Sequence, residues 1–321
     1  MSDSELPEPT EKTEETRLDK LVSQRFALSR RAAQEAIITG RVDLEGFLCQ
    51  EPGRMVEPDA QLHFDMNRPK ARRVVDSPVN VLYDDSHFVV IQKPPGVPTT
   101  PSGDWETDTV VSRVGRYFAI RHGGQEPYVG VVHRLDMDTS GVMIFAKNPE
   151  VTRKLQETWR SHDIGREYLS IVMDSLPKES MTCRREVVET GERRRRLARP
   201  GEKGQEAVTH IELVEVLSRR GSLVRCIPET GRTHQIRLHL NSIGCPVFGD
   251  ELYGRKVRND QVKPPRLCLH AARLHFKHPV TGEAMEFDTQ LPDDMAHFAQ
   301  KLAKLEHKQD RARRNRRSSD D

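Results

Sequence analysis

The nine residues HRLDMDTSG at positions 133–141 decide how this sequence is interpreted. Apolar runs flank them on both sides, at 129–132 and 142–146. Both runs are short and rich in branched residues, which predicts two strands with a polar loop between them. Loops held by rigid strands often carry binding and catalytic residues, but many charged surface loops are simply solvated. Composition alone leaves both interpretations of this loop open.

The overall composition is that of a folded chain with a polar surface. Its 321 residues are 35% hydrophobic and 31% charged, with a mean hydropathy of −0.69, so a core and a charged surface are both expected. No run approaches the roughly 20 apolar residues of a membrane span, and the acidic N-terminus lacks a signal or transit peptide pattern. Five dispersed cysteines without a CxxC pair fit reduced thiols. We therefore expect a cytoplasmic protein without disulfides, a metal site or a membrane partner.

The net charge of +2 conceals local clusters. Residues 193–199 and 311–317 contain five arginines each. Basic clusters on a chain of balanced total charge indicate a polyanionic partner bound on particular faces. Like-charge runs at a terminus are usually disordered. The run that includes Arg193 and Arg194 lies inside a folded region, so we expect it to form a mobile basic loop that contacts RNA or DNA.

Changes in composition divide the chain into five parts. These are a disordered acidic tail (1–16), a small module (17–64), a basic linker (65–77), a larger domain (78–305) and a basic, disordered tail (306–321). The larger domain contains many predicted strands and few helices, without regular alternation of the two. This pattern predicts an α+β fold with a mixed, largely antiparallel sheet, and an amphipathic helix over 293–305.

The module at 17–64 has two predicted helices followed by short strands. Ser29 can cap the second helix, which Gly40 ends. With SRRAAQEAIITGRVDL (29–44) at its centre, the module resembles an S4-type RNA-binding domain. Leu-Glu-Gly replaces the common Asn-Gly at 44–46, which we expect to alter the turn rather than RNA contact. The resemblance implies RNA binding through three arginines around the second helix, Arg30, Arg31 and Arg41.

A second polar motif, ETGRTHQIRLH, occupies residues 229–239. It begins at a turn and continues with alternating polar and apolar residues, which is typical of a strand with Arg237 on its polar side. An arginine near an apolar core needs a carboxylate or phosphate partner. The loop at 133–141 offers Asp136, and an ion pair favours the ionised carboxylate. The alternatives are a strand-surface arginine and ordinary polar histidines, because the His234–His239 spacing alone is no metal signature.

The order of these motifs resembles the RluA-type family of pseudouridine synthases with an N-terminal S4 domain. The matching segments are 84–96, 133–148, 166–172 and 229–254, which follow in the expected order within residues 80–300. HRLDxxTSG followed by TGRTHQIRxH is a highly specific combination. The resemblance implies a pseudouridine synthase fold, an RNA substrate, and neither a cofactor nor a metal.

The resemblance also implies a role for individual residues. Asp136 matches the catalytic aspartate, Tyr168 an aromatic residue that packs against the target base, and Arg237 the basic partner of the carboxylate. Arg134 matches a residue that helps to extrude the uridine, and Ile236 lines the pocket beside Arg237. We also expect Arg232 and His234, in the same motif, to contact the substrate, and we read Asp138 as structural.

The chemistry accounts for these residue types. Uracil must detach from C1′, rotate and rejoin through C5, after a base flip that costs a few kcal/mol. An aromatic ring can stack the flipped base, a contact worth about 1–3 kcal/mol. An ionised Asp136 can act as nucleophile or base. Attack on the ribose, attack on the base and proton removal through a glycal intermediate all stay open.

Two classes of function other than a pseudouridine synthase are compatible with parts of this sequence. A non-catalytic RNA-binding protein would keep the S4 module and an inactive pocket. A glycosidase would use Asp136 and Asp138, although its two carboxylates usually lie about 5–10 Å apart on separate elements. For the synthase, the resemblance to S4-containing family members implies large-subunit (23S) ribosomal RNA as the substrate, with tRNA as the alternative. We expect a monomer.

Overall fold

The structure is a computed structural model that describes most of the chain. The described residues are 15–45, 47–49, 52–67, 79–101, 107–121, 128–191, 194–255 and 263–317. Residues 1–14, 68–78 and 318–321 lie outside them, and so does Arg193. The expected tails and linker are therefore described only in part. The chain divides into two compact units, one comprising Met1–Ser77 with Pro101–Thr109 and the other Pro78–Thr100 with Val110–Asp321.

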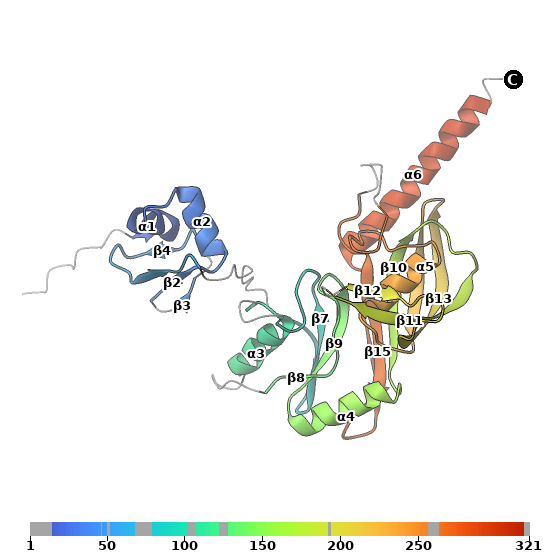
Figure 1. The fold of residues 1–321 in the computed structure, drawn as a ribbon, viewed down its shortest axis with the longest axis horizontal. Helices are drawn as coiled ribbons and strands as arrows, with labels where there is room; N and C mark the ends of the chain where they lie inside the picture. The colour runs from blue at the N-terminus through green and yellow to red at the C-terminus, as the bar shows by residue number, and fades with distance from the viewer. Residues whose placement is uncertain are drawn as a thin grey trace, which may run out of the picture. The chain divides into compact units, whose positions relative to one another are not determined.

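The first unit packs two helices against short strands (Figure 1). In chain order its elements are β1 (Thr16–Arg17), α1 (Leu18–Arg25), α2 (Arg30–Ile38), β2 (Val42–Leu44), β3 (Phe47–Leu48), β4 (Met55–Val56) and β5 (Leu62–Phe64). Ser29 Oγ accepts a hydrogen bond of 3.2 Å from the Ala32 N–H, as expected of an N-cap. Leu18, Val22 and Ile37 are fully buried, so one apolar core holds both helices.

The turn after β2 is the place where the module departs from the usual S4 pattern. Glu45 has a φ of 52°, in the left-handed region that asparagine and glycine adopt more readily. Its side-chain Oε1 accepts a hydrogen bond of 2.7 Å from the Gln61 N–H, which fastens the turn to the chain just before β5. The three-stranded sheet β3–β2–β5 forms with this turn.

The second unit is built on an eleven-stranded sheet. Its strands are β6 (Asn80–Asp84), β7 (Phe88–Lys93), β8 (Gly130–Val131), β9 (Ser140–Ala146), β10 (Gly165–Met173), β11 (Ser180–Thr190), β12 (Arg194–Leu197), β13 (Gln205–Ser218), β14 (Gly221–Pro228), β15 (Leu269–Lys277) and β16 (Ala284–Asp288). The order is β12–β11–β13–β14–β10–β15–β9–β7–β6, with β16 beside β15 and β8 beside β9. Only β15 and β9 pair in parallel among the described strands. The predicted α+β fold with a mixed, largely antiparallel sheet is therefore confirmed.

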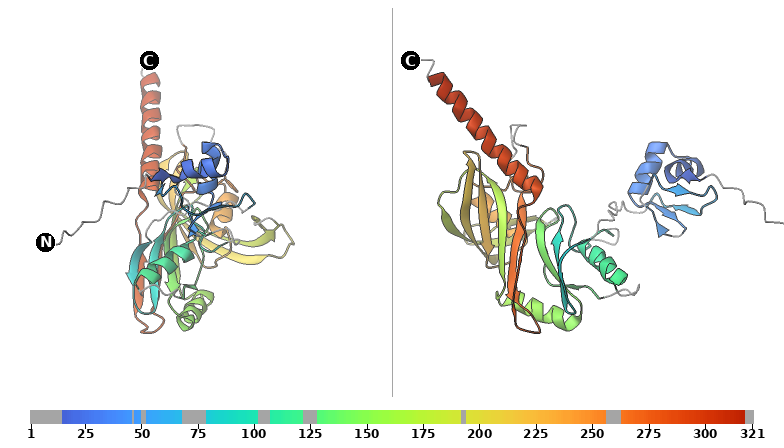
Figure 2. Two further views of the ribbon diagram at one scale, coloured as in Figure 1. Left: turned by 90° about the vertical axis from the view of Figure 1, so that its left-hand side faces the viewer. Right: turned by 180° about the vertical axis from the view of Figure 1, so that it is seen from behind.

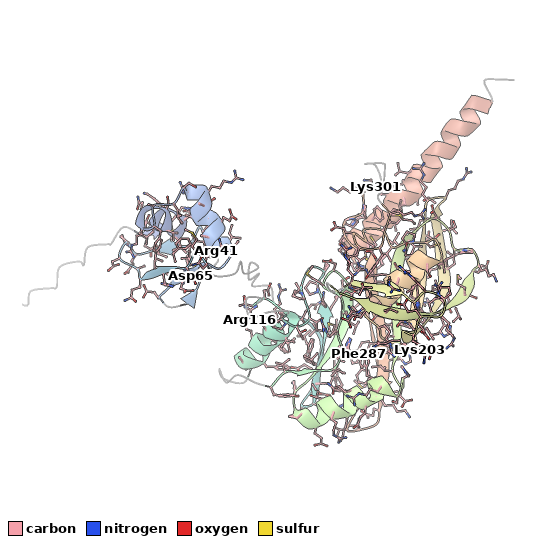
Figure 3. All side chains as sticks on the ribbon, viewed as in Figure 1. Arg41, Asp65, Arg116, Lys203, Phe287 and Lys301 are labelled. Carbon is pink, nitrogen blue, oxygen red and sulfur yellow. The ribbon has the colours of Figure 1, made fainter. Side chains whose placement is uncertain are left out.

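Helices cover both faces of the sheet around β7 and β9. Helix α3 (Val110–Arg121) packs through Val114 against the face that carries Ile91 and Phe145. Helix α4 (Pro149–Arg160) packs through Leu155 against the opposite face, with Phe88. Successive strand residues point to opposite faces, so strands covered on both sides must be apolar throughout. This explains the continuous apolar runs in the sequence. Phe287 of β16 joins the α4-side cluster (Figure 3).

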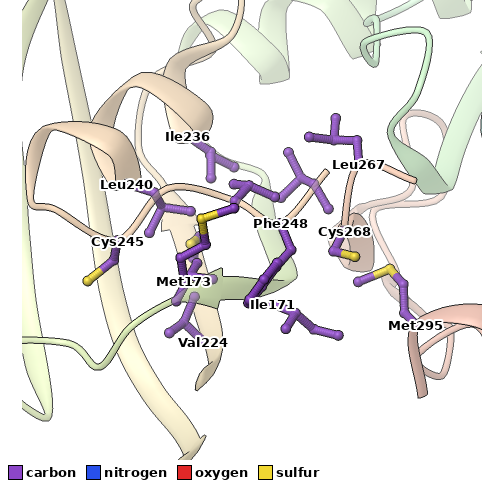
Figure 4. Close-up of a cluster of buried hydrophobic side chains, with 14 of the residues drawn as sticks. Ile171, Met173, Val224, Ile236, Leu240, Cys245, Phe248, Leu267, Cys268 and Met295 are labelled. Carbon is purple, nitrogen blue, oxygen red and sulfur yellow. The ribbon is translucent and has the colours of Figure 1, made fainter. Parts of the chain in front are cut away.

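The largest apolar cluster lies around β10, β14 and the segments that follow (Figure 4). Ile171, Val224 and Leu240 are each fully buried there. Helix α6 (Asp293–Arg317) contributes Met295 and Leu302 to the same cluster. This core anchors helix α5 (Gln235–Ser242), which carries the second polar motif.

Two sequence-based assignments in this unit are wrong. The segment after His234 is helix α5 and not a strand. Every residue from Gln235 to Leu240 is buried, so the alternation of polar and apolar residues could not reveal the helical period. Within the Arg-rich run, Arg194–Leu197 forms strand β12, paired with β11 from Val187 to Thr190, where a mobile loop was expected. Arg196 is bound there by Glu202 through two hydrogen bonds of 2.5 and 2.7 Å, so the ladder and this ion pair order the run.

The end of the chain also differs from the expectation. Helix α6 continues to Arg317, whereas the sequence suggested a helix ending at residue 305 and a disordered basic tail (Figure 2). The added residues are mostly alanine, arginine, lysine and glutamine, which have high helix propensity. Propensity therefore outweighs like-charge repulsion in this stretch. No helix in the described part of the chain is long and apolar enough to cross a membrane.

Candidate active site

A buried lysine binds the backbone of the loop at 133–139 through hydrogen bonds. Lys93, at the end of β7, is fully buried, and its Nζ donates hydrogen bonds to three carbonyls, those of Pro94, Met137 and Thr139, at 2.9, 2.7 and 2.8 Å. Burial lowers the pKa of Lys93 to about 7, although the charges of Asp138 and Asp136 oppose this. Three acceptors match the three donors of an ammonium group. The loop backbone therefore has a fixed place next to the sheet.

Two further contacts fix the same loop. Thr99 Oγ1 donates to the Leu135 carbonyl at 2.9 Å and accepts from the Leu135 N–H at 3.2 Å. His133 stacks on Trp159 of α4, with ring centroids 4.1 Å apart and planes 16° apart. Burial lowers the pKa of His133 to about 3, so the stacked ring is neutral at physiological pH. The loop is therefore bound at its start by Trp159, near its middle by Thr99 and at its end by Lys93. These contacts give Asp136 a defined position.

Arg237 lies between two carboxylates. Its Nη1 donates to Asp136 Oδ2 at 3.2 Å, so the ion pair suggested by the sequence is present. On its other side, Nε and Nη2 donate to the two oxygens of Asp250 at 2.8 and 2.7 Å. The Arg237 and Asp250 side chains are only 7% and 1% exposed, whereas Asp136 is 22% exposed. Asp250 therefore anchors the guanidinium, and Asp136 is the carboxylate that remains accessible.

The charges of this triad support one another. Burial alone would lower the pKa of Arg237, but the hydrogen bonds and charges of Asp250 and Asp136 raise it instead. Burial likewise disfavours ionised Asp250, yet the Arg237 guanidinium and two backbone N–H groups lower its pKa. Arg237 is consequently a permanent cation at the side of the Asp136 carboxylate.

His234 and Tyr253 complete this side of the site. His234 precedes α5 with a φ of 59°, and its Nε2 lies 3.9 Å from Asp136 Oδ2. Its Nδ1 is 2.7 Å from the Tyr253 hydroxyl. Burial lowers the pKa of His234, while the charge of Asp136 opposes this shift. The Tyr253 ring also lies against Arg237, with 5.2 Å between its centroid and the guanidinium carbon.

Tyr168 of β10 lies near the same carboxylate. It pairs with Cys226 of β14 and Ala271 of β15, next to a bulge between Glu167 and Tyr168. Burial raises the pKa of Tyr168; the Arg166 guanidinium counteracts this and the charge of Asp136 adds to it. An aromatic ring on a central strand, a carboxylate and a cation therefore lie close to one another, which suits a flat base next to a reactive centre.

The other expected site residues are distributed differently. Arg134 is exposed on the loop. Arg232 is exposed too, and its Nε donates to the Glu206 carbonyl at 3.1 Å. Ile236 is 7% exposed and belongs to the large apolar cluster. Arg194 is exposed on β12, whereas Arg193 is outside the described residues.

The expected RNA-binding arginines of the first unit surround α2. Arg31 is exposed and Arg41 is half-buried. Arg30 is largely exposed, and its Nη2 lies 3.5 Å from Asp19 Oδ1. These positions leave the cationic groups of Arg30 and Arg31 accessible to a polyanion.

Sequence reasoning missed three residues that the structure places in the site: Lys93, Asp250 and Tyr253. All three lie in segments that matched the family pattern, in KPPG (93–96) and GDELYG (249–254). The buried arginine was itself a clue, since a guanidinium with five donors needs more than one carboxylate. Among the described residues, no group of three or more histidine, cysteine, aspartate or glutamate side chains is placed to hold a metal ion.

Known family patterns and individual relatives match this chain. The RNA pseudouridylate synthase family pattern matches residues 87–242, and the S4 domain pattern matches residues 16–62. Ribosomal large subunit pseudouridine synthase D of Zymomonas mobilis is 32% identical over 291 residues, which cover 87% of this chain and 91% of that protein. The Vibrio cholerae protein of the same name is 32% identical over 296 residues, covering 87% and 89%.

Solved structures show the same fold. Human RNA pseudouridylate synthase domain containing 4 has a TM-score of 0.59 and 24% identity, and the match covers 70% of this chain and 92% of that one. The S4 pattern, the synthase pattern and relatives this similar along most of their length lead to one conclusion: the chain belongs to the RNA pseudouridine synthase family.

Proposed function

We propose that this chain isomerises uridine to pseudouridine in large-subunit ribosomal RNA, with Asp136 as the catalytic residue. The observation that carries the proposal is the accessible Asp136 carboxylate held 3.2 Å from Arg237, whose position a second, buried carboxylate fixes. An oriented anion of this kind can attack a ribose or a base, or remove a proton. The ribosomal substrate is supported by the S4 domain and by the names of the relatives.

The surrounding residues supply the rest of the reaction. Tyr168 stacks the flipped uracil beside Asp136, a contact of about 1–3 kcal/mol in other proteins. Arg134, exposed on the same loop, helps to displace the uridine from its stack. Ile236 supports Arg237 from the apolar side, and Arg232 and His234 contact the nucleotide. No step in this scheme uses a cofactor or a metal ion.

Tritium release from RNA labelled with 5-³H-uridine tests the activity directly, because the C5 hydrogen leaves as the new bond forms. We expect release from 23S ribosomal RNA by the wild type and a loss of at least about 10²-fold in Asp136→Asn. Asp138→Asn is the matched control, since it removes an exposed carboxylate from the same loop without touching Arg237. Equal activity of Asp136→Asn and the wild type would disprove the assignment.

The choice of RNA is tested in the same assay. Bulk tRNA, run beside ribosomal RNA, should release no tritium; release from tRNA alone would transfer the proposal to that substrate. Free uracil or an abasic site among the products would indicate a glycosidase. Binding without any release would indicate a non-catalytic RNA-binding protein.

The hairpin β11–β12 is proposed to bind the RNA backbone. Arg195 and Arg196 already pair with Glu189 and Glu202, at 2.6 and 2.5 Å. Arg194 is exposed, and we assign the phosphate contact to it. Arg194→Ala should weaken RNA binding and reduce the slope of log K against log salt by about 0.7–0.9, the value for one phosphate. Arg153→Ala on α4 is the control, because Arg153 is exposed and pairs with Glu157. An unchanged salt slope would exclude Arg194.

The S4 unit, the cell compartment and the oligomeric state complete the proposal. Arg30, Arg31 and Arg41 bind RNA outside the catalytic centre, so their joint replacement by alanine should raise KM more than it lowers kcat. Five free, buried cysteines fit a reducing cytoplasm. We propose a monomer, for which light scattering should give a mass close to 36.7 kDa.

A further inference from the structure

Tyr253 contacts both groups that surround the Asp136 carboxylate. Its ring lies against the Arg237 guanidinium, and its hydroxyl is 2.7 Å from Nδ1 of His234. The other nitrogen of that imidazole, Nε2, is 3.9 Å from Asp136 Oδ2. The reaction proposed above gives Tyr253 no role, although this residue contacts both Arg237 and His234.

The same hydroxyl is also bound to the basic hairpin. The backbone N–H of Arg195 in β12 donates to the Tyr253 hydroxyl oxygen at 3.2 Å. The Arg195 side chain pairs with Glu189 of β11 at 2.6 Å, and the two strands pair from Val187 to Thr190. Strand β12 is therefore paired with β11 at the residue whose N–H binds the phenol. A small displacement of β12 would therefore move the Arg195 N–H that binds the Tyr253 hydroxyl.

One arrangement of the donors leads from Arg195 through Tyr253 to His234 and Asp136. The phenol oxygen accepts from Arg195, so its own proton is free to be donated to Nδ1 of His234. A neutral imidazole that accepts at Nδ1 carries its proton on Nε2, which faces Asp136. The distance of 3.9 Å is longer than a hydrogen bond. Contacts of this kind in free enzymes often tighten only when the substrate is bound.

A cavity of about 510 Å³ opens between β12 and α5 and includes Tyr253 in its lining. Arg194, Arg196 and Asn241 also line it. Guanidinium and amide groups are the usual protein contacts of RNA phosphate and ribose oxygens. RNA bound in this cavity would press on β12 beside Arg195, at the start of the donor chain.

We propose that Tyr253 is a positioning residue that transmits RNA contact at β12 to the catalytic carboxylate. RNA seated against the hairpin shortens the contact between His234 and Asp136, and the carboxylate is then held by two donors, Arg237 and His234. The carboxylate reaches its reactive orientation only when RNA occupies the hairpin side. The inference rests on the proposed function, because it deepens the role of the same site.

The variant Tyr253→Phe isolates the hydroxyl, because the ring can remain against Arg237. We expect the single-turnover rate at saturating RNA to fall about two- to tenfold, the equivalent of one hydrogen bond, with no change in the RNA dissociation constant. Tyr128→Phe is the matched control, since its hydroxyl meets Thr152 at 3.1 Å outside the site and its loss should leave the rate unchanged. An unchanged rate in Tyr253→Phe, or a loss of affinity alone, would overturn the proposal.

A double-mutant cycle tests whether Tyr253 acts through His234. With His234→Gln, the double variant should be no slower than the slower single variant, because both changes interrupt one chain. If the rate loss of the double variant equals the product of the two single rate losses, the two residues act independently. Thermal unfolding of all variants shows whether a lower rate merely follows loss of folded protein.

A measurement without RNA keeps this inference separate from the substrate assignment. In ¹⁵N-histidine-labelled free protein, the His234 resonances are identified by their absence in His234→Gln. We expect the wild type to carry the proton on Nε2, and Tyr253→Phe to show a mixture of the two tautomers. A proton on Nδ1 in the wild type would reverse the chain and refute the proposal. If the wild type releases no tritium from RNA, the proposed function fails while this result still decides the donor chain.

Discussion

Replacing Asp250 with asparagine tests the part of the site that sequence reasoning did not find. Asp250 is 1% exposed and accepts four hydrogen bonds, two from Arg237 and two from the backbone N–H groups of Leu252 and Tyr253, the last two at 3.0 Å each. Asparagine has nearly the same shape but no charge. The variant therefore removes the buried counter-charge of Arg237 while it disturbs the packing little.

The size of the effect follows from the burial of the pair. Removing one partner of a buried ion pair destabilises a protein by about 3–5 kcal/mol, because the other charge stays behind uncompensated. Arg237 keeps Asp136 at 3.2 Å, so we expect the lower end, about 3 kcal/mol. For a unit of roughly 150–250 residues each kcal/mol shifts Tm by about 2–4 °C. The second unit should therefore unfold about 6–12 °C lower.

Thermal unfolding followed by tryptophan fluorescence measures this shift. A Trp105→Phe background leaves Trp159 of α4, which belongs to the second unit, as the single tryptophan. The tritium-release rate should fall as well, because Arg237 then orients Asp136 less firmly. Asp138→Asn is the control for the loss of one carboxylate. A Tm within 2 °C of the control would refute the argument, because Arg237 would then not depend on Asp250.

The pH dependence gives an independent check of the same pair. The folded-state pKa of Asp250 is lowered, since Arg237 outweighs the opposing effect of burial. A group whose folded pKa is depressed contributes stability above its unfolded pKa, which is about 3.9 for aspartate, and loses it as the pH falls through the folded value. The difference in stability between wild type and Asp250→Asn should thus be constant from pH 5 to 7 and shrink below about pH 4. A difference that grows on acidification would contradict the sign of the shift.

Three further outcomes are expected. The folded pKa of Lys93, about 7, lies below its ordinary value of 10.5, so the unfolded chain holds the extra proton between these values; the free energy of unfolding in urea should rise from pH 7 to 10 in the wild type relative to Lys93→Met. His133, whose pKa burial lowers to about 3, should show no change in its ring proton shifts between pH 8 and 5 in NMR spectra. Gly141→Ala should destabilise the second unit by about 3 kcal/mol in urea, because a Cβ at its φ of 125° would lie 2.1 Å from the Ala271 carbonyl oxygen; a free energy within 0.5 kcal/mol of wild type would contradict this clash.

The sequence by itself determined the local elements and the identity of the reactive loop. The continuous apolar run at 142–146 predicted β9, since a strand covered on both faces has no polar side. The amphipathic pattern over 293–305 predicted the first part of α6, whose Met295 and Leu302 pack into the core. The rule that a guanidinium near a core requires an anion made Asp136 a candidate partner of Arg237, 101 residues away, and the family resemblance implied the pair that the structure shows.

Other features were decided by tertiary contacts. Helix α5 could not be distinguished from a strand, because it is buried on every side and periodicity is visible only when one face is exposed. The order of strand β12 depends on its neighbour β11 and on Glu202, neither of which a run of arginines reveals.

The same applies to the surroundings of Asp136. Asp250 and Tyr253 matter because the turn after α5 folds back onto Arg237, and Lys93 matters because three carbonyls converge on it. Residue types and spacing specify which chemistry is possible. The distances that select one carboxylate as the reactive group and the other as its anchor exist only after the chain has folded, because they depend on burial and on partners far apart in the sequence.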